Sequence, residues 1–194
     1  MSDPVRSGKA ALLIIDMLNK LDFGGGETMR PHAETAAEVI ANLRAQADAA
    51  DAGVIYCNDN FGDWSQDRAE LVAEALSAES AGRGLAERLR PRDDDYLVVK
   101  PQFSGFYATT LPAVLPRLGV SRLVLTGIAA DICVLFTAAD AHMREYELWV
   151  PTDAVASEDE QRKHWALDIM ARSMSAEIRP TTELSLEAWL SSGR

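Results

Sequence analysis

Short apolar segments alternate with longer amphipathic segments along the chain, and this alternation limits the folds that the chain can adopt. The apolar segments are too short for helices and are typical of buried strands, whereas the longer segments carry apolar residues at helical spacing. The predicted strands cover residues 11–16, 54–57, 96–99, 123–126 and 147–150, with a short sixth strand at Ile178. The predicted helices cover residues 31–52, 68–80, 109–118, 133–141, 158–174 and 184–190.

Strands and helices in alternation favour a parallel sheet covered by helices on both faces. We therefore expect an α/β fold, a three-layer α/β/α sandwich with a mainly parallel, Rossmann-like, six-stranded sheet. No internal repeat and no linker interrupts the sequence. Residues 1–194 are accordingly expected to form one domain.

Composition and charge exclude several classes of protein. The chain has 47% hydrophobic and 25% charged residues, a globular balance rather than a disordered one. Its formal net charge of -11 argues against a nucleic-acid surface, because phosphate binding needs clustered Lys and Arg. No apolar run is long enough to cross a bilayer and no signal-peptide segment is recognised, so we expect a cytoplasmic protein without a membrane partner.

The chain has two cysteines, Cys57 and Cys133, and no CxxC or Cys/His spacing surrounds either. This argues against a disulfide framework and against a structural zinc site. Cys57 lies within a predicted strand and is expected to be a core residue.

Cys133 is a candidate nucleophile. Residues 122–138, RLVLTGIAADICVLFTA, predict a strand, a tight turn and a helix that begins near this cysteine. Asp131 is a plausible N-cap, which places the sulfur in the first helical turn, where free N–H groups favour a thiolate and can hold an oxyanion. The alternative is a buried, inert cysteine, because its neighbours Ile132 and Val134 are apolar.

Asp16, Lys100 and Cys133 each follow a predicted strand, so a parallel sheet brings all three to one edge. Asp16 is the available base and Lys100 the available cation. The alternatives are a capping role for Asp16 and an exposed position for Lys100. The histidines lie in or beside predicted helices, away from these strand ends: His32, His142 and His164.

Polar and aromatic residues fill the loops after the predicted strands. Glycines at residues 24–26 form a flexible connection, and residues 58–64 follow the second strand. Such loops line substrate sites, although turn chemistry also selects Asn and Asp, and each aromatic residue can instead belong to the core. The candidate pocket residues are Asn19, Phe23, Asn58, Phe61, Trp64, Phe103 and Phe106.

Three segments together carry a resemblance to a known family. They are LLIIDMLN at residues 12–19, KPQFSGFYATTL at residues 100–111 and TGIAADICVLFTA at residues 126–138. In this order and at these distances they resemble the isochorismatase-like cysteine hydrolases, which include nicotinamidases, carbamoylsarcosine amidohydrolases and ureidoacrylate hydrolases. The resemblance covers nearly the whole chain.

The resemblance implies a catalytic triad of Asp16, Lys100 and Cys133. It also implies a cis peptide bond between Ile128 and Ala129, and an oxyanion hole made by the backbone N–H groups of Ala129 and Cys133. The implied reaction is hydrolysis of a small amide or ureido C–N bond through a thioester, without a cofactor. A homo-oligomer acting on a small-molecule substrate is implied as well.

Two departures from the family bear on the substrate. Nicotinamidases carry an Asp-x-His metal motif after the second strand, whereas this chain has Asn58, Asp59 and Asn60 there, so we expect no metal. Isochorismatases proper lack the cysteine and cleave a vinyl ether, so Cys133 favours an amidase. Two alternatives stay open: an ether hydrolase, and a non-enzymatic protein that binds a ligand or senses oxidation through Cys133.

Overall fold

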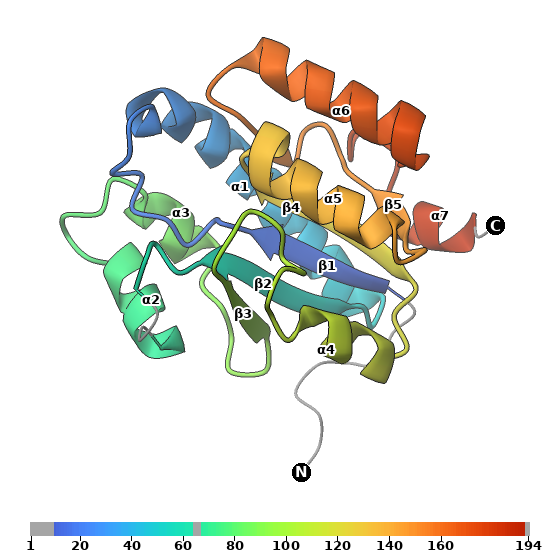
Figure 1. Ribbon diagram of the computed structural model, residues 1–194, viewed down its shortest axis with the longest axis horizontal. Coiled ribbons are helices and arrows are strands. Elements are labelled where there is room, and N and C mark those ends of the chain that lie inside the picture. The colour runs from blue at the N-terminus through green and yellow to red at the C-terminus, as the bar shows by residue number, and fades with distance from the viewer. Residues whose placement is uncertain (1–9, 64–66, 193–194) are drawn as a thin grey trace.

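A parallel β-sheet forms the centre of the molecule (Figure 1). The computed structural model describes residues 10–63 and 67–192, and these contain six strands of one sheet. Five strands run in the order β3-β2-β1-β4-β5 and β6 pairs with β4, every pair being parallel. The strands are β1 (Ala10–Ile15), β2 (Gly53–Asp59), β3 (Tyr96–Lys100), β4 (Arg122–Ile128), β5 (Glu147–Trp149) and β6 (Val155–Ala156).

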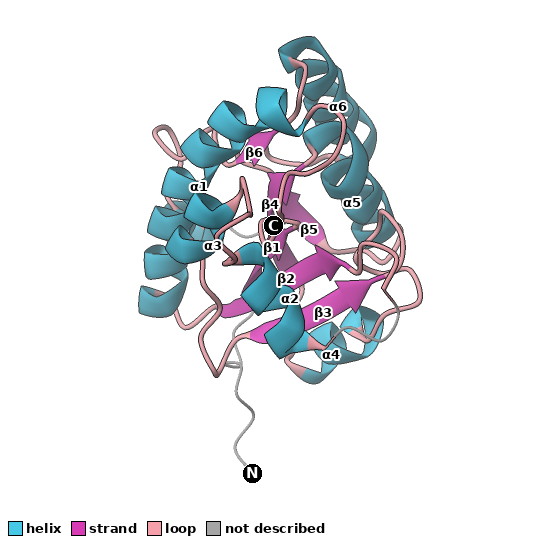
Figure 2. Cartoon of the chain, turned by 90° about the vertical axis from the view of Figure 1, so that its left-hand side faces the viewer, coloured by secondary structure: helices cyan, strands magenta, loops and turns pink. Residues whose placement is uncertain are grey.

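Helices cover both faces of the sheet, and Figure 2 shows α1 and α3 on one side with α5 and α6 on the other. The helices are α1 (Gly26–Ala49), α2 (Arg68–Ala75), α3 (Arg83–Arg88), α4 (Leu111–Arg117), the short π-helix η1 (Ala130–Val134), α5 (Leu135–His142), α6 (Glu160–Met174) and α7 (Leu186–Ser191). No helix of the described segments has both the length and the apolar character of a membrane span.

The hydrophobic core has two halves, one on each face of the sheet. Side chains alternate between the faces of a strand, so Leu12 and Ile14 of β1 pack into the cluster under α1, α3 and α7. Leu13 and Ile15 pack into the cluster under α4, α5 and α6. All six residues of β1 are buried, as expected for a central parallel strand covered on both faces. The predicted three-layer arrangement is therefore confirmed.

The sixth strand lies elsewhere than predicted. It was expected at Ile178, but there only Glu177 makes an isolated bridge, to Trp149. The sixth strand is β6, which pairs with the end of β4. A strand of two residues has no room for an alternating or continuous apolar pattern, which explains why the sequence did not indicate it.

Several element boundaries also differ from the predicted ones. The first helix begins at Gly26 rather than at Pro31, which lies inside α1. The segment predicted as one helix over residues 68–80 ends at Ala75, and α3 begins after Gly82. β2 continues to Asp59, so this acid belongs to a strand end rather than to a loop.

Candidate active site

Four neighbouring strands each end in, or lead into, a polar or reactive side chain (Figure 1). Lys100 is the last residue of β3 and Asp59 the last residue of β2. Asp16 directly follows β1, and Cys133 follows β4 inside η1. Because the strands are parallel, these groups share the carboxyl edge of the sheet, which is where open α/β folds bind their ligands.

Lys100 is the centre of this cluster. Its side chain is fully buried, and Nζ lies 2.8 Å from Oδ2 of Asp16. The same Nζ is 3.5 Å from Sγ of Cys133 and 3.4 Å from Oδ2 of Asp59. A buried ammonium is tolerated only when it is paired. The structure thus brings together the three side chains proposed from the sequence and adds Asp59, which had no predicted catalytic role.

Asp16 is held by the backbone of β2. Its N–H donates to the carbonyl of Cys57 at 3.0 Å, and its Oδ1 accepts from the N–H of Asp59 at 2.7 Å. The residue has φ 52°, in the left-handed region that non-glycine residues rarely adopt. The chain therefore turns sharply after β1 at the residue that contacts Lys100.

Cys133 lies in a π-helix rather than in the first turn of an α-helix. The peptide bond between Ile128 and Ala129 is cis, at the position implied by the resemblance. The carbonyl of Ala129 then accepts from the N–H of Val134 at 3.1 Å and closes the wide first turn of η1. π-Helical turns inside helices are rare and occur often at functional sites.

The prediction that Asp131 caps the helix is wrong. The N-cap position of η1 is Ala129, and no side chain caps it. The Asp131 carboxylate instead accepts from Oγ of Ser157 at 2.6 Å and pairs with Arg162 at 2.7 Å. These contacts tie η1 to β6 and α6, because Ser157 directly follows β6 and Arg162 lies in the first turn of α6.

Burial sets the protonation of the cluster. It raises the pKa of the Cys133 thiol, and the charge of Asp16 raises that pKa further, against the opposing effect of Lys100. Burial also raises the pKa of Asp16, although Lys100 attracts the carboxylate. For Lys100, burial lowers the pKa, but the negative charges around it, Asp16 first, outweigh burial and raise it. Burial thus opposes the charged form of both Cys133 and Asp16, whereas the contact with Lys100 favours it.

Two predicted pocket residues support the backbone instead. The buried Asn58 accepts from the N–H of Leu18 at 3.1 Å and donates to the Leu18 carbonyl at 3.0 Å. Oδ1 of Asn19 accepts from the N–H of Leu21 at 2.8 Å. These amides hold the loop that follows β1, which is the loop that begins with Asp16.

Exposed phenylalanines follow each of the four strands that carry the cluster. Phe23, Phe61 and Phe103, which were predicted to line the pocket, are 41%, 46% and 47% exposed. Phe136, which was not predicted, is 51% exposed, and its ring lies 5.5 Å from that of Phe103. Phe136 follows Cys133 by three residues, as Phe103 follows Lys100, and this equal spacing was a signal for it in the sequence.

The remaining predicted aromatic residues do not join these four. Phe106 is buried in the core, with its ring 6.0 Å from that of Tyr146. Trp64 lies outside the described residues.

The Asp59 carboxylate is fully engaged, since Oδ1 accepts from the N–H of Phe61 at 2.7 Å and Oδ2 faces Lys100. Within the described ranges, no group of three or more His, Cys, Asp or Glu side chains is arranged to hold a metal ion. Both carboxylate oxygens of Asp59 are thus in contact with other groups of the protein.

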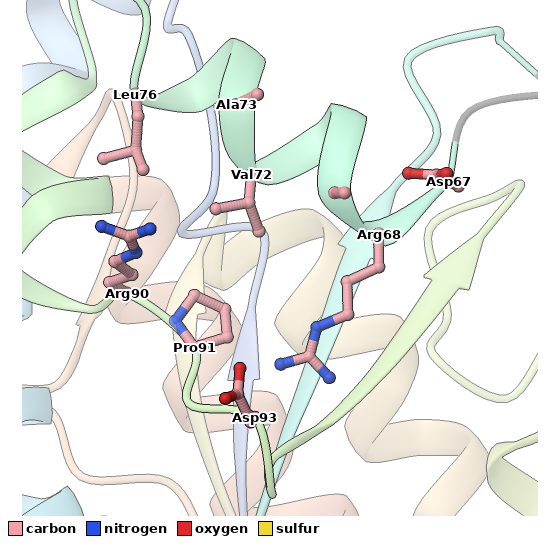
Figure 3. A pocket seen from close by; sticks show the side chains of 9 residues that line it. Asp67, Arg68, Val72, Ala73, Leu76, Arg90, Pro91 and Asp93 are labelled. Carbon is pink, nitrogen blue, oxygen red and sulfur yellow. The ribbon is translucent and has the colours of Figure 1, made fainter.

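A surface groove lies away from this cluster, between α2 and the chain segment that precedes β3 (Figure 3). Its volume is about 700 Å³, and Val72, Leu76 and Pro91 line its middle with Arg68 at one side. None of the four clustered residues lines it. The groove and the cluster at the sheet edge are therefore separate features of the surface.

Comparison with known proteins places the chain in a family. The isochorismatase domain matches residues 10–183. The isochorismatase family protein YaaI of Bacillus subtilis is 39% identical over 173 residues, which span 89% of this chain and 93% of that protein. The ureidoacrylate amidohydrolase RutB of Serratia proteamaculans is 29% identical over 171 residues, which span 75% of this chain and 69% of that protein.

Solved structures agree with the sequence comparison. The crystal structure of N-carbamoylsarcosine amidase from Thermoplasma acidophilum superposes with a TM-score of 0.71 and 29% identity, covering 92% of this chain and 99% of that one. The chain therefore belongs to the isochorismatase family of hydrolases.

Proposed function

We propose that the chain is a cysteine-dependent hydrolase that cleaves the C–N bond of a small amide or ureido compound through a thioester. One observation carries the proposal: a single buried lysine ammonium lies within 2.8 Å of a carboxylate and 3.5 Å of a thiol at the carboxyl edge of the sheet. This arrangement supplies a nucleophile, a base and a fixed positive charge.

In the first half of the proposed reaction, Asp16 takes the proton of Cys133 as the sulfur attacks the substrate carbonyl carbon. Lys100 remains an ammonium and stabilises the negative charge as it moves from Asp16 to the sulfur. The backbone N–H groups of Ala129 and Cys133 are the proposed donors to the oxyanion. The protonated Asp16 then gives its proton to the leaving nitrogen, and a thioester forms.

In the second half, Asp16 is again a carboxylate and accepts a proton from water, which attacks the thioester carbon. The C–S bond breaks, the thiol of Cys133 is restored and a carboxylic or carbamic acid leaves. Sulfur, one carboxylate and one ammonium carry out every step, so the proposed route needs no cofactor.

The relatives and the exposed aromatic rings support the substrate class. The names of two relatives are those of a ureidoacrylate amidohydrolase and an N-carbamoylsarcosine amidase, both enzymes of C–N bonds next to a carbonyl. Phe103 and Phe136 present partly exposed rings at this edge of the sheet. Flat apolar rings exclude water from a reacting carbonyl and orient small planar groups such as amides and ureas.

The proposal extends to the setting of the enzyme. We expect a cytoplasmic homo-oligomer, with the exposed side chains of Met143 and Trp165, at 70% and 59%, as candidates for burial between copies. Size-exclusion chromatography with light scattering tests this part, and a monomer at all concentrations would contradict it.

The main test is intact mass spectrometry after incubation with small primary amides and ureido acids. Wild type is expected to gain the mass of an acyl group and to release ammonia or an amine. Cys133→Ala is expected to gain none and to lose turnover by at least on the order of 10³-fold. Cys57→Ala is the matched control, because it removes the other, fully buried cysteine and should still be acylated.

Undiminished amide turnover by Cys133→Ala would contradict the cysteine mechanism. An ether hydrolase would turn over no amide and would keep its activity on a vinyl ether in Cys133→Ala. No adduct and no turnover in wild type with any member of the library would favour a binding or redox-sensing protein.

A further inference from the structure

Lys100 reaches Asp16 by crossing a strand. Lys100 ends β3 and Asp16 follows β1, and β2 lies between these two strands. Neighbouring strands are about 4.8 Å apart, so the lysine side chain must span roughly 10 Å of sheet edge. In the register of β2 and β3, the residue paired with Lys100 is Asp59. Asp59 therefore lies beside the path that the lysine takes.

Asp59 contacts both members of the ion pair. Its backbone N–H donates to Oδ1 of Asp16 at 2.7 Å, and its Oδ2 lies 3.4 Å from Nζ of Lys100. Its Oδ1 accepts from the N–H of Phe61 at 2.7 Å, which fixes the carboxylate at the end of β2. Nζ thus has three partners, Asp16, Asp59 and Cys133, which matches the three hydrogens of an ammonium.

We propose that Asp59 is a positioning residue for the hydrolysis, acting as a second, permanent counter-ion that holds Lys100 in place while the proton moves between Cys133 and Asp16. The inference rests on the proposed function for its catalytic meaning. In the proton transfer, the S–H bond of Cys133 breaks and an O–H bond forms on Asp16, so the negative charge moves from oxygen to sulfur. Asp16 is then neutral and attracts Lys100 less, whereas Asp59 keeps its charge throughout.

The cluster charge gives this role a measurable consequence. With both carboxylates counted as ionised, Lys100 as an ammonium and Cys133 as a thiol, the formal charge of the cluster is about one negative unit. Ionisation of Cys133 to solvent adds a second. Removing the Asp59 charge therefore makes this ionisation easier, while it loosens the lysine on which the reaction depends.

Two other ionisable groups near the thiol do not complicate the interpretation of the Cys133 ionisation. Cys57 on β2 is neutral, because burial raises the pKa of its thiol to about 12. Asp131, two residues before Cys133, is engaged with Ser157 and Arg162. Asp59 is consequently the charge at this edge that can be removed without removing a proposed reacting group.

The experiment compares Asp59→Asn with wild type in two assays. Asparagine keeps an oxygen for the Phe61 N–H and the backbone N–H for Asp16, and it replaces the charged oxygen that faces Lys100 by a neutral amide nitrogen that cannot accept from Nζ. The first assay is the pH dependence of Cys133 carbamidomethylation by iodoacetamide, followed by intact mass. We expect the midpoint in Asp59→Asn to fall by at least about half a pH unit. The second is turnover, in which kcat should fall on the order of tenfold with little change in KM.

Two further variants complete the design. Asp59→Glu restores the charge and is expected to restore the wild-type midpoint, and Asp59→Ser repeats the test should the asparagine variant not fold. Asp168→Asn is the matched control, because it removes a carboxylate from an exposed pair with Arg172 and should leave both readouts unchanged.

An unchanged midpoint in both Asp59→Asn and Asp59→Ser overturns the inference. If wild type forms no acyl adduct but the midpoint shifts, the electrostatic role of Asp59 stands and the proposed function fails. If adducts form in wild type and Asp59→Asn at equal rates, the proposed function stands and the positioning role fails.

Discussion

Asp16 and Cys133 lie in the same buried environment but have different roles in the proposed reaction, Asp16 as the base and Cys133 as the nucleophile. Burial raises the pKa of both groups, and for a carboxylate base this moves proton uptake toward neutral pH. Asp16 acts as a base only when ionised, so activity is lost as the pH falls through its raised pKa. Two groups in contact titrate as a pair, so the profile reports the pair rather than either residue.

The first prediction concerns the acid limb of the pH profile. We expect kcat/KM to decline at a pH clearly above about 4, the ordinary value for an aspartate, as the pH is lowered. Measuring kcat/KM with a neutral amide across the acidic range checks this. A rate that stays constant down to about pH 4 would contradict the raised pKa of Asp16.

A second prediction concerns Lys100, whose ammonium is the buried partner of a buried carboxylate. Lys100→Met leaves Asp16 without its cation and is expected to lower the free energy of unfolding by about 3–5 kcal/mol at neutral pH. The loss should shrink as the pH falls and Asp16 takes up a proton. Urea denaturation at several pH values measures both effects.

The double variant Asp16→Asn/Lys100→Met separates stability from catalysis. It removes both charges, so it should recover most of the lost stability and remain inactive. Lys20→Met removes an exposed lysine from pairs with Asp22 and Glu74 and should leave the free energy of unfolding almost unchanged, because solvent screens exposed pairs. A double variant as unstable as Lys100→Met would show that the charge of Asp16 is not the cause.

At the scale of elements, the sequence predicted the central strands more accurately than the short helices η1 and α3. The central strands were found because apolar runs such as residues 11–16 are continuous, which is typical of strands buried on both faces. η1 was predicted as a tight turn followed by the start of an ordinary helix at Cys133, because nothing in its residue types separates a π-turn from an α-turn. α3 was missed for another reason. Gly82 and Gly84 predicted a break in the chain, but Gly82 is the N-cap of α3 and Gly84 lies inside this six-residue helix.

The convergence of Asp16, Lys100 and Cys133 needed only that parallel strands share a carboxyl edge. The part played by Asp59 needed the strand order as well, because it depends on β2 lying between β1 and β3. Alternating strands and helices do not specify that order. In the same way, only tertiary packing separates the buried Phe106 from the exposed Phe103, since both follow β3 within six residues.

A third prediction tests the contact between the two central strands. Gly127 has φ 107°, and a Cβ at this position would lie 2.0 Å from the carbonyl oxygen of Ile15 on β1. Backbone cannot move aside as a side chain can, so Gly127→Ala is expected to cost more than about 3 kcal/mol of stability. Chemical denaturation measures the loss.

Gly84 provides the control for this substitution. It lies within α3, and a Cβ there would meet nothing within 4 Å. Gly84→Ala is therefore expected to leave stability unchanged or to raise it by up to about 1 kcal/mol. Equal losses in both variants would mean that the approach of β4 to β1 does not require glycine.

For the whole molecule, the two halves of the core are joined through the strands of the sheet, and β1 lies at its centre. Leu12 and Ile14 belong to one half and Leu13 and Ile15 to the other, so neither half can open without disturbing β1. We therefore predict a single cooperative unfolding transition, as expected of one domain. Thermal unfolding followed by far-UV circular dichroism and by tryptophan fluorescence should give coincident curves, and two separated transitions would contradict the prediction.

The central position of β1 has a consequence for how the chain is made. β1 precedes the other described strands in the chain, and one of its two neighbours, β4, ends only at Ile128. The hydroxyl of Thr126 bonds to the carbonyl of Leu13 across 113 residues of sequence. Synthesis adds about 5–20 residues per second, so β1, whose side chains are all apolar, has the backbone N–H and C=O groups of one edge unpaired for several seconds before β4 is made. The nascent chain is therefore most prone to aggregate between completion of β2 and emergence of β4, and this interval is where a chaperone would act.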